Sequence, residues 1–283
     1  MREDKHPGTL FIVATPIGNL EDITLRALKV LREVDLIAAE DTRKTRKLLS
    51  AYEIHKPLIS LYDQVEKQKS PVIISHIAGG KDVAYVSEAG TPGISDPGYQ
   101  LINAAIRESI RVVPVPGPSA VIAALSASGL PMSSFVFSGF LPSQAAKRKK
   151  HLESLRNEMR TVIVYESPQR AIDSLADMLA ILGNRRIVFA RELTKIHEEI
   201  IRGCLESVLD RLRSRGADIK GEITIVLEGA EGRLSEITDE EIIRKFSELG
   251  SDANLSTRDK ISLVSEKTGL PRSRVYKLIS SLD

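Results

Sequence analysis

Short apolar runs typical of strands alternate with segments typical of helices along most of this sequence, and this alternation is the strongest constraint on its fold. The first run, Thr9–Ala14, precedes a segment with helical apolar periodicity over Thr24–Val34. The same alternation predicts strands over 36–39, 58–61, 83–86 and 112–115, with helices such as 43–52 and 99–108 between them. Strands that alternate with helices pair in mainly parallel sheets, so the sequence predicts an α/β fold.

A proline-rich segment, Val113–Pro118, interrupts this pattern, because proline removes a backbone donor and restricts its neighbours. A second set of predicted elements follows, with strands over 135–140, 161–165, 186–190 and 222–227 and helices over 145–158, 170–182 and 205–215. We therefore predict one α/β domain over residues 1–117 and another over residues 118–230.

The remaining residues, 231–283, are predicted to form a third unit that is wholly helical. Thr238 and Glu241 match a capping box, which indicates the start of a helix. Predicted helices over 261–268 and 273–282 have helix-turn-helix spacing across the turn 269–271. The residues placed to close a small core are Val264, Leu270, Val275 and Ile279.

Composition limits the partners and the compartment. The chain is 42% hydrophobic but only 4% aromatic, with no Trp, so its core is aliphatic, as suits buried parallel strands. The formal net charge is +2 despite 40 Lys and Arg, so a polyanion would have to meet a local basic surface. A single cysteine, Cys204, excludes an internal disulfide framework. The first residues are polar and no apolar run approaches about 18 residues, so we expect a soluble cytoplasmic protein.

Several common catalytic motifs are missing from the sequence. No Gly-x-Gly-x-x-Gly follows the first strand and no Gly-x-x-x-x-Gly-Lys-Ser/Thr occurs, which argues against dinucleotide and P-loop sites. The five histidines are scattered, so we expect no metal site. Ser95 lies in Gly-Ile-Ser-Asp-Pro-Gly, which is not a nucleophile elbow.

Four loops at the carboxyl ends of predicted strands are rich in Gly, Pro, Ser and Thr, and ligands of α/β proteins bind at such ends. In chain order the first to fourth loops are 14–20, 87–98, 116–120 and 165–168. The second loop alone holds three glycines, which let a ligand approach the backbone closely. Each loop by itself is typical of an ordinary strand-to-helix turn, but their joint placement predicts a binding site.

These segments, in this order, resemble the tetrapyrrole (corrin and porphyrin) methylases, the class III S-adenosylmethionine-dependent enzymes. Gly90-Thr91-Pro92 aligns with the Gly-Asp-Pro of that family and departs from it at Thr91. The branch that methylates ribosomal RNA is similar in the segments Ala14–Leu20, Ala39–Arg43, Ser87–Gly98, Tyr165–Pro168, Arg191–Lys195 and Lys220–Glu222. The resemblance covers about residues 8–229.

The resemblance implies two α/β/α domains with a cofactor cleft between them, followed by the small all-helical C-terminal unit. It also implies 2′-O-methylation of a cytidine in the decoding region of 16S ribosomal RNA by a homodimer. By position, the family's contacts to S-adenosylmethionine fall on Pro16, Gly90, Thr91, Pro92, Ile94, Ser119, Ala120, Tyr165, Gly221 and Ile223. Many of these would be backbone contacts, as suits a cofactor with a neutral adenine and ribose.

Methyl transfer to a ribose hydroxyl releases a proton, so a carboxylate or lysine that accepts it is expected. The candidates are Glu88, Glu166, Asp96, Glu40 and Asp41. Glu88 and Glu166 rank first, because both lie in loops that should flank the methyl group. Asp96 precedes a proline and also fits a turn, and Glu40 and Asp41 also fit helix caps.

Basic side chains predict the RNA-contacting surface. Arg43, Lys44, Arg46 and Lys47 follow a first-domain strand, and Arg191 and Lys195 flank a second-domain loop, so all six are candidates for phosphate contacts. The run 147–150 is more typical of a solvated helix face. In the tail, Arg272, Arg274 and Lys277 fit either a nucleic-acid recognition helix or a structural cap.

Two other functions are compatible with parts of this pattern. A methylase of small tetrapyrrole-like molecules would share the fold and the cofactor, but it leaves the basic groups and the helical tail unexplained. A non-catalytic helix-turn-helix regulator with a ligand-sensing α/β body would explain the tail, but it leaves the four loops without a purpose.

Overall fold

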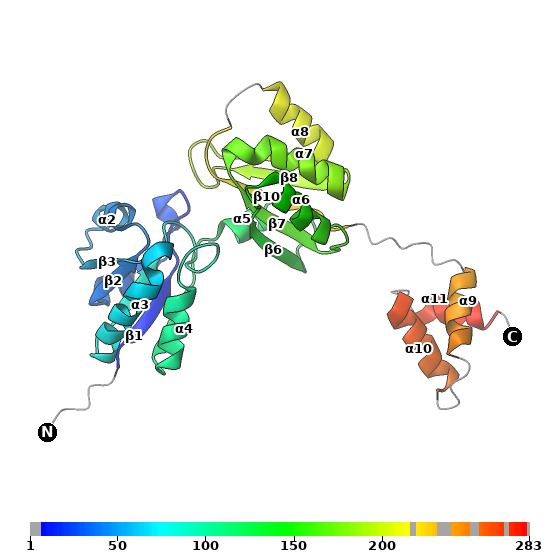
Figure 1. The fold of residues 1–283 in the computed structure, drawn as a ribbon, viewed down its shortest axis with the longest axis horizontal. Helices are drawn as coiled ribbons and strands as arrows, with labels where there is room; N and C mark the ends of the chain where they lie inside the picture. Colours follow the sequence, from blue (N-terminus) through cyan, green and yellow to red (C-terminus); the bar gives the residue numbers. More distant parts are fainter. Residues whose placement is uncertain (1–6, 216–218, 231–238, 250–254, 269–271, 282–283) are drawn as a thin grey trace. The chain divides into compact units, whose positions relative to one another are not determined.

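The computed structural model describes residues 7–215, 219–230, 239–249, 255–268 and 272–281. The chain divides into two compact units, Met1–Gly229 and Ala230–Asp283 (Figure 1). The first unit contains two five-stranded sheets, and the second contains only helices among its described residues. This confirms the predicted α/β class with C-terminal helices. The division of the first unit into domains at residue 117 stays a prediction.

The first sheet is wholly parallel, with the strand order β3-β2-β4-β1-β5. Its strands are β1 (Thr9–Val13), β2 (Leu36–Ala39), β3 (Leu58–Ser60), β4 (Val83–Val86) and β5 (Arg111–Val115). All four residues of β4 are buried, as expected for a strand covered by helices on both faces. The predicted parallel sheet is therefore confirmed.

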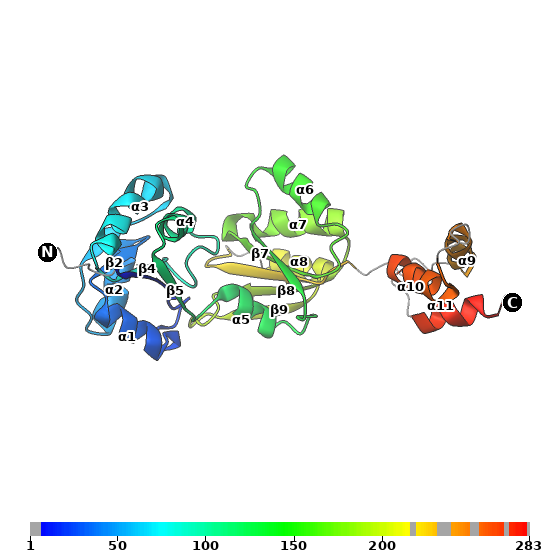
Figure 2. The same ribbon diagram turned by 90° about the horizontal axis from the view of Figure 1, so that it is seen from below.

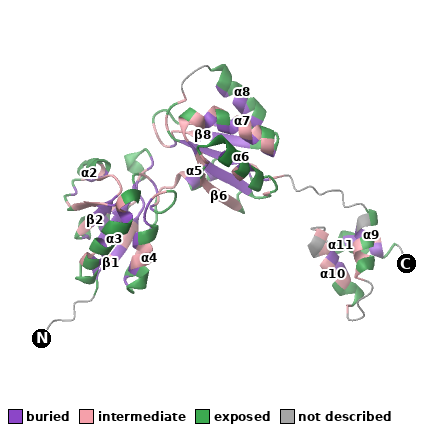
Figure 3. Ribbon diagram, viewed as in Figure 1, coloured by how far each residue is buried: buried purple, intermediate pink, exposed green. Residues whose placement is uncertain are grey.

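Helices cover both faces of this sheet. The connecting elements are the short 3-10 turn η1 (Leu20–Asp22), α1 (Leu25–Glu33), α2 (Thr42–Ala51), α3 (Asp63–Ala78) and α4 (Tyr99–Arg107). One apolar cluster joins the sheet to Val30 of α1 and Leu49 of α2. A separate cluster on the opposite face joins it to Ile73 of α3 and Leu101 of α4. The apolar side chains thus form a core on each side of the sheet, with buried residues along its strands (Figure 3).

The second sheet is mixed, with the order β6-β7-β10-β8-β9. Its strands are β6 (Phe135–Phe140), β7 (Thr161–Glu166), β8 (Arg186–Arg191), β9 (Glu199–Cys204) and β10 (Ile223–Leu227). Only β6 and β7 are parallel, and β10 runs antiparallel to both of its neighbours. The sequence predicted four of these strands and missed β9, which forms a hairpin with β8.

The two faces of the second sheet are covered differently. On one face lie α6 (Ala145–Ser154), α7 (Ala171–Leu182) and α8 (Leu205–Ser214), with the turn η2 (Pro168–Arg170) before α7. On the other face lies α5 (Ala120–Ser126) (Figure 2). Strand residues alternate between these faces. In β7, Tyr165 therefore packs on the α5 side, whereas Glu166 faces α7.

The second unit has a small core of its own. Its helices are α9 (Asp239–Glu248), α10 (Thr257–Thr268) and α11 (Arg272–Ile279). Val264, Val275 and Ile279 are buried together with Ile242 and Ile261, which confirms three of the predicted core positions. Thr238, Leu270 and the predicted turn 269–271 lie outside the described residues, as does the Glu241 side chain. No helix within the described ranges is long and apolar enough to cross a membrane.

A chain that ends at Gly229 is expected to fold by itself and to unfold in one cooperative transition. The reason is that every core cluster of the first unit uses residues up to Leu227 only, and the tail cluster shares none of them. Thermal unfolding followed by circular dichroism tests this. A chain that ends at Gly221 is the control, because it lacks β10 from the middle of the second sheet and should not fold. An aggregated or molten 1–229 chain would contradict the prediction.

Candidate functional site

The first and second loops lie side by side at the carboxyl edge of the first sheet. They follow β1 and β4, which are neighbours, but the chain leaves β1 toward α1 on one face and β4 toward α4 on the other. Diverging connections of this kind leave a crevice in which ligands of α/β sheets bind. Here Thr15 N donates to Gly90 O at 2.8 Å and Gly90 N donates to Thr15 O at 3.0 Å. The two predicted loops are thus joined directly.

The third loop packs against the same bridge. The Thr91 hydroxyl donates to Pro118 O at 3.3 Å. Gly90 has φ +79°, and a Cβ added there would lie 3.4 Å from Ile17 Cγ2 and 3.8 Å from Pro118 O. A side chain at this position would therefore fill the space between the three loops, which explains why glycine occupies it.

Tyr165 of the fourth loop completes the assembly from the second sheet. Its ring lies 4.9 Å from the Phe137 ring and 5.4 Å from the Phe140 ring, measured between centroids. It packs against the apolar cluster that includes Ile17 of the first loop and Val121 of α5. On the neighbouring strand β6, a Cβ added to Gly139 would lie 3.5 Å from the Ser95 hydroxyl. The four loops thus converge, as their joint placement in the sequence predicted.

Large apolar side chains remain exposed at the second loop and at the end of β6. Ile94 of the second loop is 46% exposed, and Phe140 at the end of β6 is 55% exposed. The sequence singled out Ile94 but missed Phe140, whose only signal was its place at the end of a strand. An exposed aliphatic and an exposed aromatic side chain offer apolar surface to a flat ring.

Side chains from α3 and β4 brace the far end of the second loop. The Tyr85 hydroxyl donates to Pro97 O at 2.7 Å. One carboxylate oxygen of Glu66 accepts hydrogen bonds from the backbone N–H groups of Gly98 at 2.9 Å, Gln100 at 2.8 Å and Leu101 at 3.2 Å. Because Gly98 has no side chain to cap α4, Glu66 caps it instead. This cap carries no local sequence signal, since 32 residues separate Glu66 from Gly98.

Acidic side chains of the second loop and of neighbouring elements interact with one another. Burial raises the pKa of Asp96 to about 7, and the charges of Glu40 and Asp63 add to this effect, whereas a hydrogen bond from Ser87 opposes it. Burial and the charge of Asp63 also raise the pKa of Glu40, against the opposing effect of Lys44. Burial raises the pKa of Tyr165 to about 12, with a contribution from Asp96. Asp96 thus interacts electrostatically with groups from both sheets.

Glu88, one of the two carboxylates ranked first as a base, lies at the surface of the second loop. Its side chain is 41% exposed and forms an ion pair with Lys44 of α2. Its backbone N–H donates to Glu40 Oε2 at 3.0 Å. Asp41 caps α2 by accepting from Arg43 N at 2.8 Å, which confirms the alternative role considered for it.

Glu166, the other carboxylate ranked first, is enclosed on the α7 side of the second sheet. Its Oε1 pairs with Arg170 Nη2 at 2.7 Å, and its Oε2 accepts from the Ser174 hydroxyl at 2.5 Å. Strand alternation turns it away from Tyr165, so the predicted role as a base does not fit this position. The same alternation places the Ile223 side chain in the α7-side core, which leaves only its backbone for a cofactor. Thr224, directly opposite Tyr165 and missed from the sequence, shares its face.

The remaining predicted positions line the loops. Pro16, Ser119 and Ala120 are half-buried, Pro92 is buried, and Gly221 is half-buried with φ +92°. A Cβ added to Gly221 would lie 2.4 Å from the Glu192 carboxylate, so this glycine is required by a close approach. Thr15 is 2% exposed, and its hydroxyl has no hydrogen-bond partner among the described residues.

The six basic residues fall into two groups. Arg191 pairs with Glu199 at 3.3 Å, and Lys195 pairs with Glu192 at 2.9 Å and with Glu222 at 3.0 Å. Because Arg191 and Lys195 already form ion pairs within the protein, they are weaker candidates for phosphate contacts. On α2, Arg43 and Lys44 pair with Asp41 and Glu88. Arg46 and Lys47 are exposed, and neither forms an ion pair with another described residue.

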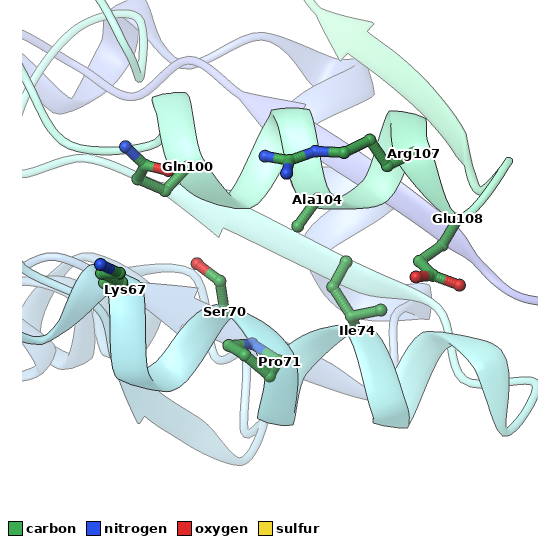
Figure 4. A pocket seen from close by; sticks show the side chains of 8 residues that line it. All are labelled: Lys67, Ser70, Pro71, Ile74, Gln100, Ala104, Arg107 and Glu108. Atoms are coloured by element: carbon green, nitrogen blue, oxygen red, sulfur yellow. The ribbon is translucent and has the colours of Figure 1, made fainter.

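One pocket borders the first loop, another lies between α3 and α4, and a third lies beside α2, with Arg46 in its lining. The first, of about 610 Å³, opens between the first loop and the segment 192–197, with Asn19 and Thr194 among its lining residues. The second, of about 390 Å³, is a groove between α3 and α4, where Ile74 faces Ala104 (Figure 4). Only the first borders a predicted site loop and includes Lys195, so it is the better candidate for part of a binding cleft.

Comparison with known proteins shows which family this sequence matches. The family model "Tetrapyrrole (Corrin/Porphyrin) Methylases" matches residues 9–209. The chain is 43% identical to the ribosomal RNA small subunit methyltransferase I of Halalkalibacterium halodurans, over 98% of this chain and 96% of that protein. It is 50% identical to the protein of the same name from Thermotoga maritima, over 79% of this chain and all of that protein.

The fold agrees with this assignment. The uroporphyrin-III C-methyltransferase of Thermus thermophilus, solved with S-adenosyl homocysteine, superposes with a TM-score of 0.56 at 17% identity, over 82% of this chain and 100% of that one. The four converging loops all lie within the matched segment. The chain belongs to the tetrapyrrole (corrin/porphyrin) methylase family, whose members take their methyl group from S-adenosylmethionine.

Proposed function

We propose that the protein transfers a methyl group from S-adenosylmethionine to the 2′ hydroxyl of a cytidine in the decoding region of 16S ribosomal RNA. The observation that carries this proposal is the 43% identity, over nearly the whole chain, to a ribosomal RNA small subunit methyltransferase I. The ribose as the position of methylation and the decoding region as the target are inferred from the resemblance of the loop motifs to the RNA-methylating branch. By the same resemblance, we propose that it acts as a homodimer in the cytoplasm.

The residues at the four loops fit S-adenosylmethionine. Backbone groups of Pro16, Gly90, Thr91, Pro92, Ser119, Ala120, Gly221 and Ile223, with the side chains of Ile94 and Tyr165, are the proposed contacts. The buried Thr15 hydroxyl beside them lacks a partner among the described residues, and a bound polar group would satisfy it. The exposed Ile94 and Phe140 offer apolar surface to the adenine. Such a set suits the neutral adenine and ribose of this cofactor.

The protein's own part in the reaction is chiefly positioning. The cofactor supplies a methyl group already activated on a sulfonium, so the chain has to hold the acceptor oxygen in line with it and exclude water. The Thr15–Gly90 bridge and the Glu66 and Tyr85 braces fix the loops that would do this. A group that accepts the hydroxyl proton completes the requirement.

The RNA surface is proposed to lie on α2, with Arg46 and Lys47 as its phosphate contacts. Replacing both with glutamate is expected to reduce the slope of log affinity against log salt by about one to two units, since each phosphate contact contributes about 0.9. Filter binding of small-subunit RNA at several salt concentrations measures the slope. The control is Lys147→Glu with Lys150→Glu on α6, which makes the same charge change on an exposed helix face. Equal losses in both double variants would refute a specific α2 surface.

Incubation of the protein with methyl-labelled S-adenosylmethionine tests the function. With small ribosomal subunits we expect label in 16S RNA, on a cytidine that then resists alkaline cleavage at its 3′ phosphate, since that cleavage needs a free 2′ hydroxyl. Label on a base rather than the ribose would refute the position of methylation. Label in a tetrapyrrole and not in RNA would refute the substrate. Donor binding without turnover on any substrate would point to a regulator instead.

A further inference from the structure

Asp96 occupies a position that distinguishes it from the other carboxylates of the loops. It lies on the second loop between Ser95, whose φ of +66° is strained for a residue with a side chain, and Pro97, whose carbonyl is held by Tyr85. It is only partly exposed, whereas Glu88 on the same loop points toward solvent and pairs with Lys44. The loop is therefore anchored directly after Asp96, and a strained turn precedes it.

The groups around Asp96 come from several elements. Glu40 at the end of β2 and Asp63 at the start of α3 are the carboxylates that act on it, and Ser87 at the end of β4 is its hydrogen-bonding neighbour. Tyr85 of β4 and Tyr165 of β7 both respond to its charge. Glu66 is engaged with the backbone of α4, and Lys44 acts on Glu40. No cation appears among the groups that act on Asp96 within the described chain.

Such an environment makes the carboxylate a stronger base than an ordinary aspartate. Burial and two like charges raise the pKa of Asp96 to about 7. A base with its pKa near the working pH is both substantially deprotonated and able to hold a proton. Glu166 lies on the far side of its sheet, and Glu88 is held at the surface by Lys44. Asp96 instead lies on the loop that bridges to Thr15 through Gly90, next to Ser95, whose hydroxyl is 3.5 Å from the position of a Cβ on Gly139 of the second sheet. This placement where the loops meet, together with its basicity, distinguishes Asp96 from the other two carboxylates.

We propose that Asp96 is the catalytic residue that accepts the proton of the target hydroxyl. This inference rests on the proposed function and names the base for it. As the ribose oxygen forms its bond to the methyl carbon, the carbon–sulfur bond breaks with its electron pair going to sulfur. The hydroxyl proton passes to a carboxylate oxygen of Asp96, and the side chain is then a neutral acid until solvent takes the proton. No further reactant is needed.

Replacing Asp96 with asparagine tests the role, because it keeps the size and removes the basicity. We expect kcat to fall by about 10² to 10⁴-fold, the range for loss of a general base. Calorimetry should show that the affinity for S-adenosylmethionine changes by less than a few fold. A D96N variant with near-normal kcat would overturn the proposal, and so would one that loses donor affinity instead of kcat.

Variants of the neighbouring acids provide a second test. Its readout is the pH dependence of kcat, which would not shift if Asp96 had only a structural role. In the wild type kcat should rise with pH through about 7, where Asp96 loses its proton. Asp63→Asn removes a repelling charge, so the pKa should fall and the rise should move to lower pH, with the plateau at high pH unchanged. Glu40→Gln should move it further, because Glu40 has the larger effect. Glu108→Gln, at the far end of α4, is the control and should not move it.

A carbon NMR titration of the cofactor-free protein gives a readout independent of turnover. The Asp96 carboxyl resonance, identified by its loss in D96N, should titrate near 7 in the wild type and lower in the Asp63 and Glu40 variants. An ordinary aspartate titration in the wild type would overturn the inference. If the wild type fails to label ribosomal RNA, the proposed function falls. If it labels RNA and D96N does so equally well, only the role of Asp96 falls.

Discussion

Replacing Gly98 with alanine should lower the free energy of unfolding by about 3 kcal/mol, because it combines backbone strain with overpacking. Gly98 has φ +129°, which L side chains rarely adopt, and its added Cβ would lie 2.7 Å from Cε1 of the fully buried Tyr85 ring. To relieve this contact the ring must move, and its hydrogen bond to Pro97 would be lost. We therefore also expect weaker binding of S-adenosylmethionine, since the second loop loses its brace.

Gly129→Ala is the matched control for this variant. Gly129 also has a positive φ, of +75°, but an added Cβ there meets nothing within 4 Å. It should cost only the left-handed strain, about 1 kcal/mol, and leave the donor affinity unchanged. Urea unfolding and calorimetry measure both quantities. If the two variants are equally destabilised, the contact with Tyr85 contributes nothing to the loss of unfolding free energy.

Replacing Arg170 with methionine should destabilise the protein by about 3–5 kcal/mol, because it leaves a buried carboxylate without its counter-charge. Glu166 has a fully buried side chain, and Arg170 is its ion-pair partner at 2.7 Å. Arg170 also donates to Ser167 Oγ at 2.8 Å and to Leu141 O at 3.1 Å, so its loss would loosen the start of α7. Chemical unfolding measures the effect.

Arg186→Met is the control for the ion pair. Arg186 also pairs with a carboxylate, Glu228, but its side chain is 57% exposed. Surface pairs of this kind contribute at most about 1 kcal/mol, so this variant should be nearly as stable as the wild type. Similar losses in both variants would contradict the structural role of the Glu166 pair. The companion variant Glu166→Gln should keep its kcat wherever it is folded, whereas a base at this position would lose it.

The sequence predicted the elements of the fold well, because their signals are local. Alternation of apolar runs and helical periodicity located the strands of the first sheet to within a residue or two, and its parallel pairing followed from the helical connections. The four site loops were also found, since Gly and Pro mark them directly. Missed elements carried weak or non-local signals: β9 is a short hairpin strand, and the mixed order of the second sheet depends on pairings across the chain.

The sequence by itself determined the fold class, the site loops and the family, because short motifs and periodic patterns indicate each of them. Only the tertiary structure distinguished the environments of the candidate carboxylates, on which the proposal for Asp96 is based. Strand alternation turns Glu166 toward α7, an ion pair with Lys44 holds Glu88 at the surface, and burial beside Glu40 changes the acidity of Asp96. A side chain's direction and its electrostatic environment depend on residues distant in the sequence, and the fold alone brings those residues together.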